Sequence, residues 1–161
     1  MMAIVLLLAL AWGAWAAPVE VGARFGIASF VGSEYTDGTR ASINIPGASS
    51  LYAMWFPSQK VSFGPKCSFH YTSGDFGYWS SYIGALAGYY LRGHTRSGLF
   101  TEAELGRSFL QDSDGRLVMG VGLGFLSQGP VFVRRGQVQY RRWNNGGGSD
   151  LSVLFALGVR R

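Results

Sequence analysis

Residues 19–31 read VEVGARFGIASFV, and apolar residues alternate with polar or small ones along this stretch. The odd positions from 19 to 27 carry apolar side chains, whereas the even positions carry Glu20, Gly22, Arg24 and Gly26. Successive side chains of a β-strand point to opposite faces, so this period of two predicts a strand with one apolar and one polar face.

The same alternation recurs along the rest of the chain, and no helical pattern of comparable length competes with it. It predicts eight strands, at residues 19–30, 49–57, 60–71, 79–92, 98–109, 116–126, 131–143 and 150–160. Short connections such as GHTRS (93–97) alternate with longer polar ones such as GSEYTDGTRASINIPGAS (32–49). This plan predicts an all-β fold, an eight-stranded antiparallel up-and-down transmembrane β-barrel of the kind found in bacterial outer membranes.

The composition agrees with a single exported domain. The chain has 161 residues, of which 48% are hydrophobic and only 14% charged. An apolar run at the start ends in Ala14-Trp15-Ala16, a small-x-small pattern that predicts a signal peptide at residues 1–16 and a barrel domain at residues 17–161. A retained membrane anchor is the alternative, but the run is shorter than the roughly 20 apolar residues that a spanning helix needs. The single cysteine, Cys67, excludes an intramolecular disulfide.

A soluble lipocalin-like barrel that binds an apolar ligand would show the same period but turn its apolar face inward. The position of the glycines favours the membrane barrel, because small residues relieve crowding in a narrow polar interior. The glycines that share the polar parity are Gly22, Gly26, Gly64, Gly84, Gly88, Gly106, Gly120, Gly122, Gly124 and Gly158. Aromatic residues near the strand ends also suggest two interfacial belts, with Phe56 and Tyr90 among those at the turn end.

The basic stretch VFVRRGQVQYRRW (131–143) raises the question of nucleic-acid binding, in a chain of formal net charge +5. Its residues Arg135, Gln137, Gln139 and Arg141 share one face, so we interpret it as a barrel strand and expect no nucleic-acid partner. We expect a lumen charge network made of Arg24, Lys66, Glu102, Glu104, Arg135 and Arg141. Since few acids face inward, Glu102 and Glu104 are the first candidates to pair with the two arginines of this strand.

Four other basic residues are expected in contact with water. Lys60, Arg92 and Arg160 share the polar parity but lie near the turn ends. Arg134 falls on the lipid face close to the interface, where its side chain can extend to water.

The C-terminal segment GPVFVRRGQVQYRRWNNGGGSDLSVLFALGVRR (129–161), with GYYLRG (88–93) and GLGFLS (122–127), resembles small bacterial outer-membrane β-barrel domains of the broad OmpA/OmpX type. The resemblance implies delivery through the periplasm, insertion by the barrel-assembly machinery, and contact with outer-membrane lipid.

These observations predict an outer-membrane protein with a structural or surface-interaction role, its specificity carried by the outer loops and chiefly by the first. A lipid-modifying enzyme similar to a lipid A deacylase is an alternative, because Ser68 and His70 lie two apart on one face. That face is the lumen side, so we expect no catalytic residues. His94 is expected in a solvated turn. No spacing suggests a metal or phosphate site, so no cofactor is expected. The interior of so small a barrel is filled by side chains, which argues against a continuous pore.

Overall fold

The computed structural model describes residues 17–32, 40–42, 50–72, 78–110, 115–129, 131–144 and 148–161, and the expected signal peptide lies outside these ranges. No helix in this described part of the chain is long and apolar enough to cross a membrane. The strands are β1 (Val19–Gly32), β2 (Arg40–Ser42), β3 (Ser50–Trp55), β4 (Val61–Thr72), β5 (Tyr78–Tyr90), β6 (Gly98–Leu110), β7 (Arg116–Gln128), β8 (Phe132–Trp143) and β9 (Ser149–Arg160).

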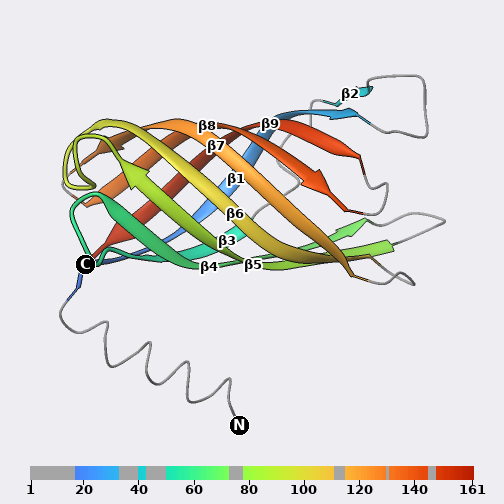
Figure 1. Cartoon of the computed structure of the whole chain (residues 1–161), viewed down its shortest axis with the longest axis horizontal. Helices are drawn as coiled ribbons and strands as arrows, with labels where there is room; N and C mark the ends of the chain where they lie inside the picture. The colour runs from blue at the N-terminus through green and yellow to red at the C-terminus, as the bar shows by residue number, and fades with distance from the viewer. Residues whose placement is uncertain are drawn as a thin grey trace, which may run out of the picture.

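Eight of these strands close into an antiparallel up-and-down barrel (Figure 1). Each strand from β3 to β8 pairs with the next one in the chain, β1 pairs with β3, and β1 also pairs with β9, which closes the sheet. The predicted fold is therefore confirmed, and each predicted range agrees with an observed strand to within two residues at either end. The three-residue β2 was not predicted, and it pairs with the far end of β1 outside the closed barrel.

The two ends of the barrel differ. The connections 56–60, 91–97 and 129–131 lie at one end together with the C-terminus, and we call this the turn end. The strand ends that flank residues 33–49, 73–77, 111–115 and 144–148 lie at the other, which we call the loop end. Gly93 in the second turn has a φ of 84°, a left-handed conformation that glycine adopts without strain.

The described side chains of the long strands alternate between the outside and the lumen. In β7, Val121 is 61% exposed whereas Val118 is 1% exposed. The large apolar side chains on the outside are Val21, Leu51, Val61, Phe63, Phe69, Ile83, Tyr89, Leu91, Leu99, Leu105, Leu117, Met119, Val121, Leu123, Phe125, Val131, Phe132, Val138, Tyr140, Leu151, Phe155, Leu157 and Val159. The lumen holds the charged groups, which is the reverse of the arrangement expected for a soluble barrel with an apolar ligand.

The pairing of β1 has one irregularity. The pairing of β1 with β9 shifts by one residue between Gly26 and Ala28, which is a β-bulge. A bulge places an extra residue on one strand and bends it locally, so the register of β1 against β9 changes after Gly26.

The lumen-facing glycines provide space for large side chains. A Cβ added at Gly22 would lie 2.5 Å from the hydroxyl oxygen of Tyr52, and one added at Gly124 would lie 2.7 Å from the ring of Phe100. Gly84 and Gly106 face each other across β5 and β6, and both lie under the ring of Tyr82. The narrow interior therefore accommodates aromatic rings because the neighbouring positions lack a side chain.

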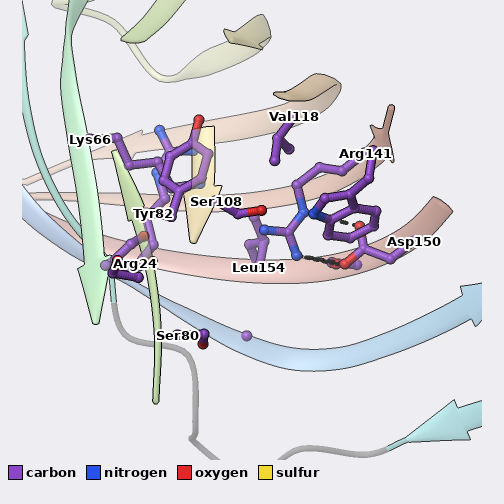
Figure 2. Close-up of a pocket in the computed structure, with 15 residues that line it drawn as sticks. Arg24, Lys66, Ser80, Tyr82, Ser108, Val118, Arg141, Asp150 and Leu154 are labelled. Carbon is purple, nitrogen blue, oxygen red and sulfur yellow. Dashed lines mark hydrogen bonds and ion pairs between the residues drawn. The ribbon is translucent and has the colours of Figure 1, made fainter. Parts of the chain in front are cut away.

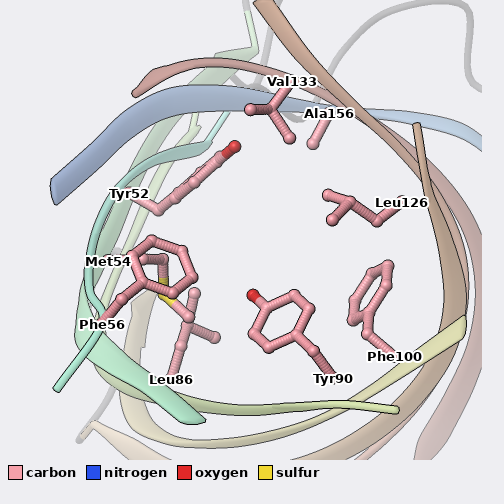
Figure 3. Packing of buried hydrophobic residues seen from close by; sticks show 9 residues of the cluster. All are labelled: Tyr52, Met54, Phe56, Leu86, Tyr90, Phe100, Leu126, Val133 and Ala156. Atoms are coloured by element: carbon pink, nitrogen blue, oxygen red, sulfur yellow. The ribbon is translucent and has the colours of Figure 1, made fainter. Parts of the chain in front are cut away.

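A hydrophobic cluster fills the lumen towards the turn end (Figure 3). Its members point inward from the surrounding wall, and they are Tyr52, Met54, Phe56, Leu86, Tyr90, Phe100, Leu126, Val133 and Ala156. Phe56 and Tyr90 are 2% and 1% exposed, so their expected place in an interfacial aromatic belt was wrong. The even parity of Tyr90 directs its ring into the barrel, where it stacks on Phe100 with ring centroids 5.7 Å apart.

Candidate functional site

The centre of the lumen is crossed by an ion pair between opposite walls. Arg24 of β1 donates from Nη1 and Nη2 to the two carboxylate oxygens of Glu102 on β6, at 2.5 and 2.6 Å. The exposed fractions of the two side chains are 2% and 0%. This two-pronged geometry matches the planar guanidinium to the planar carboxylate and fixes both side chains.

A second ion pair lies nearer the loop end. Lys66 Nζ of β4 donates to Glu104 Oε2 of β6 at 2.7 Å, and Gln139 Nε2 donates to the same oxygen at 2.7 Å. Glu104 is buried, so its charge is compensated by one cation and one amide rather than by bulk water.

A third cluster forms around Glu20 at the turn end. Oε1 accepts hydrogen bonds from Arg135 Nη2 at 2.7 Å and from the Tyr52 hydroxyl at 2.9 Å. Oε2 accepts one from Arg160 Nη2 at 2.6 Å. Glu20 and Arg160 are direct partners in the pairing of β1 with β9, so the register brings them together.

Arg135 is the centre of this cluster and is 1% exposed. Its Nη1 donates to the Tyr90 hydroxyl at 2.6 Å. Its guanidinium lies 5.3 Å from the ring centroids of both Tyr90 and Phe100, within the range of cation–π attraction. The hydrophobic cluster is thus linked to the charge network through one arginine.

The outermost ion pair lies at the loop end. Arg141 donates from Nε and Nη2 to the two oxygens of Asp150 at 3.0 and 2.6 Å, and its guanidinium lies 5.7 Å from the ring of Trp143. The Arg141 side chain is 26% exposed. Water therefore reaches this pair more readily than the four ion pairs described above.

The structure places all six residues of the expected network in the lumen, but with other partners. Arg135 pairs with Glu20 and Arg141 with Asp150, so their expected pairing with Glu102 and Glu104 was wrong. Asp150 lies directly opposite Arg141 in the pairing of β8 with β9. Arg24 of β1, on the opposite wall, reaches Glu102 instead, and Lys66 of β4 reaches Glu104.

Sequence reasoning missed three charged members of the network, Glu20, Asp150 and Arg160. All three share the polar parity, so the signal was present in the alternation. Arg160 was expected in water, but its side chain is only 9% exposed because it packs over the Phe56 ring at 4.5 Å and bonds Glu20. Gln137 and Gln139 also belong to the lumen and donate towards Glu102 and Glu104.

His94 is buried, against the expectation of a solvated turn. It is 4% exposed, and its ring lies 4.3 Å from that of Phe56 between centroids. Its carbonyl oxygen accepts a hydrogen bond from Arg160 Nη1. Burial, with the nearby charge of Arg160, lowers the pKa of His94 from its ordinary value of 6.5.

A cavity of about 370 Å³ opens at the loop end of the lumen (Figure 2). Arg141 and Asp150 lie on one side of it, and Lys66, Tyr82 and Arg24 on another. Its lining consists of Arg24, Gly26, Ser50, Lys66, Ser68, Ser80, Ser81, Tyr82, Ser108, Val118, Arg141, Trp143, Asp150, Ser152 and Leu154. Serine hydroxyls, three cations and two aromatic rings therefore converge on one space.

The other residues that the sequence singled out differ in where they lie. Ser68 lines the cavity on the lumen side, whereas the side chain of His70 is outside the described part of the structure. Arg134 is exposed on the outer face, and Lys60 and Arg92 are exposed near the turns. Within the described ranges, no group of three or more His, Cys, Asp or Glu side chains is placed to hold a metal ion.

No protein-family model matches this chain, and no curated protein sequence does either. Solved structures do match. Neisserial surface protein A (NspA) is 14% identical with a TM-score of 0.60, covering 89% of this chain and 96% of that one. The N-terminal β-barrel domain of OprF from Pseudomonas aeruginosa is 13% identical with a TM-score of 0.57, covering 89% of this chain and 97% of that one. Ail, the attachment invasion locus protein of Yersinia pestis, is 13% identical with a TM-score of 0.54, covering 90% of this chain and 97% of that one. At these identities the likeness establishes the barrel fold alone.

Proposed function

We propose that this chain is an integral protein of the bacterial outer membrane, with a packed polar lumen and a structural or surface-interaction role. The observation that carries the proposal is the inverted distribution of polarity. Charged side chains such as Arg24 and Glu102 are buried in the lumen, whereas the barrel wall exposes large apolar side chains on every long strand. Water would be a poor solvent for such a surface, and lipid hydrocarbon a good one.

Strand length supports the same proposal. Seven of the barrel strands have 12 to 14 residues. At about 3.3 Å per residue, twelve residues extend about 40 Å, which a tilt of about 45° reduces to roughly 28 Å along the membrane normal. The apolar band of an outer-membrane barrel is about 25 Å tall. The strands are therefore long enough to cross the hydrocarbon layer.

We assign the lumen charge network a structural role. Five buried or half-buried cations, Arg24, Lys66, Arg135, Arg141 and Arg160, bond to four carboxylates, Glu20, Glu102, Glu104 and Asp150. The contacts join β1, β4, β6, β8 and β9, and all but the Arg141–Asp150 pair connect strands that are distant in sequence. Such a network holds the cross-section of the barrel in one shape, and the hydrophobic cluster closes the lumen at the turn end.

The surface-interaction role is proposed for the connections at the loop end. One of the similar structures, Ail of Yersinia pestis, is named an attachment invasion locus protein, which is a surface function compatible with this architecture. We propose no catalytic role, since Ser68 of the Ser68 and His70 pair lines the lumen cavity rather than the outer face. Replacing each loop-end connection in turn, while keeping the barrel, tests which one binds a surface partner.

Location is tested by fractionation of a bacterial host that expresses the full chain. We expect cleavage after Ala16, insertion by the barrel-assembly machinery, and recovery of the mature chain with the outer membrane. A matched variant that carries arginines at Val121 and Leu123, both on the outer face, is expected to be depleted from that fraction. Recovery of the unaltered chain in the soluble periplasm would contradict the proposal.

A further inference from the structure

The cavity at the loop end of the lumen has an unequal set of charges on its wall. Three cations line it, Arg24, Lys66 and Arg141, against one carboxylate, that of Asp150. The carboxylates of Glu102 and Glu104 balance two of these cations, but both are fully buried and do not line the cavity. A solute in the cavity therefore contacts three cations and Asp150 but neither glutamate, and this favours an anion.

The cations retain donors for such a solute. An ammonium carries three N–H donors and a guanidinium five. Lys66 Nζ donates to Glu104, and Arg141 uses Nε and Nη2 on Asp150. Arg24, which is 2% exposed and lines the cavity, has an Nε with no hydrogen-bond partner in the described part of the chain. An unpartnered buried N–H is costly, and a bound oxygen atom would satisfy it.

The remaining lining is suited to hydroxyl groups rather than to a bare ion. Five serines with the lumen parity line the cavity, Ser50, Ser68, Ser80, Ser108 and Ser152, and each hydroxyl can both donate and accept a hydrogen bond. Tyr82 and Trp143 add aromatic surfaces, on which the C–H face of a sugar ring can pack. The volume of about 370 Å³ falls at the lower end of the range for small-molecule sites, which admits one or two sugar rings.

We propose that this cavity binds an anionic saccharide unit, with its acidic group towards Arg141 and Lys66 and its hydroxyls towards the serine side chains that line the cavity. The site does not depend on the surface role proposed above, because it is built from strand residues of the lumen and not from the loop-end connections. The binding chemistry is the same for a free sugar phosphate and for the phosphorylated end of a longer glycan.

The mature chain, refolded in micelles of an uncharged detergent, is titrated with glucose 6-phosphate, glucose and inorganic phosphate. Calorimetry measures binding, and the fluorescence of Trp143 reports occupancy in a W55F/W79F background. We expect glucose 6-phosphate to bind at least about tenfold more tightly than either glucose or phosphate, a difference of about 1.4 kcal/mol. The affinity for an oligosaccharide that carries a terminal phosphate is compared with that for glucose 6-phosphate. This comparison distinguishes a glycan end from a free sugar phosphate.

Two variants and a control locate the site. Ser108→Leu fills the cavity without changing charge, and the double variant R141M/D150N removes the exposed ion pair without leaving an unpaired charge. Each is expected to weaken glucose 6-phosphate binding at least about tenfold. Ser127→Leu, an exposed serine at the turn end of β7, should leave it unchanged. Equal binding of glucose or of phosphate, absence of binding, or equal loss in the Ser127 variant would overturn the proposal.

Discussion

Replacing Glu102 by alanine removes the carboxylate that holds Arg24 in the centre of the barrel. Both Nη atoms of Arg24 bond to Glu102, and the side chain is 2% exposed. The substitution therefore leaves a buried guanidinium without its counter-charge. Charge centres about 4 Å apart attract by about 4 kcal/mol at an effective dielectric constant near 20. This agrees with the roughly 3–5 kcal/mol lost when one partner of a buried pair is removed.

We therefore expect Glu102→Ala to lower the free energy of unfolding by about 3–5 kcal/mol. The double variant R24M/E102A should recover most of this loss, because neither charge then remains buried alone. Asp150→Asn serves as the matched control. It breaks an ion pair whose arginine is 26% exposed, and a loss of only about 1 kcal/mol is expected after allowance for solvent screening.

The assay is reversible urea unfolding of the mature chain refolded in lipid vesicles, followed by tryptophan fluorescence. The double-mutant cycle of Arg24 and Glu102 gives the coupling energy directly. Strictly additive losses, or an E102A variant as stable as the unaltered chain, would show that the two charges do not stabilise each other.

Three further outcomes follow from the structure. Gly106→Val should cost about 1–3 kcal/mol in the same unfolding assay because its Cβ would overlap the ring of Tyr82, whereas Gly136→Ala, with no atom within 4 Å of the new Cβ, should be close to neutral. Val121→Arg on the outer face should cost roughly 2–4 kcal/mol in vesicles, and Val121→Leu should cost little. The lowered pKa of His94 means that the unfolded chain binds a proton more readily, so stability should be full above the ordinary pKa of 6.5 and fall as the pH decreases below it. A His94→Gln variant that loses as much stability below pH 6.5 as the unaltered chain does would contradict this.

Most of the fold could be predicted from the sequence because the inside and outside of a barrel wall impose opposite polarity on successive residues. This constraint fixed the eight strand ranges, the lumen position of Arg135 and Arg141, and the use of glycine beside large lumen side chains. It did not extend to β2, whose three residues lie in a polar connection without alternation. The alternation also did not predict the bulge between Gly26 and Ala28, because the apolar pattern of the sequence continues through these residues.

The partners within the lumen could not be predicted from parity. Parity indicates on which face of the barrel wall a side chain lies, but neither its position along the barrel axis nor its neighbours. Arg141 meets Asp150 through the register of two adjacent strands, whereas Arg24 meets Glu102 across the barrel, 78 residues away in sequence. Both relations depend on how the strands are staggered when the sheet closes. His94 shows a second limit of prediction from sequence. Its position in a turn suggested exposure to water, whereas its ring packs against that of Phe56.

The proposal that the barrel wall faces lipid is tested most directly at Cys67, the single cysteine, which lies midway along β4 and is exposed. An environment-sensitive fluorophore attached to Cys67 is compared, in vesicles, with the same label at a Ser108→Cys position in a Cys67→Ser background, where Ser108 lines the lumen cavity. We predict that lipids brominated on their acyl chains quench the label at position 67 and that aqueous iodide does not, with weak lipid quenching at position 108. Strong quenching of the position 67 label by iodide, without quenching by the brominated lipids, would contradict the account.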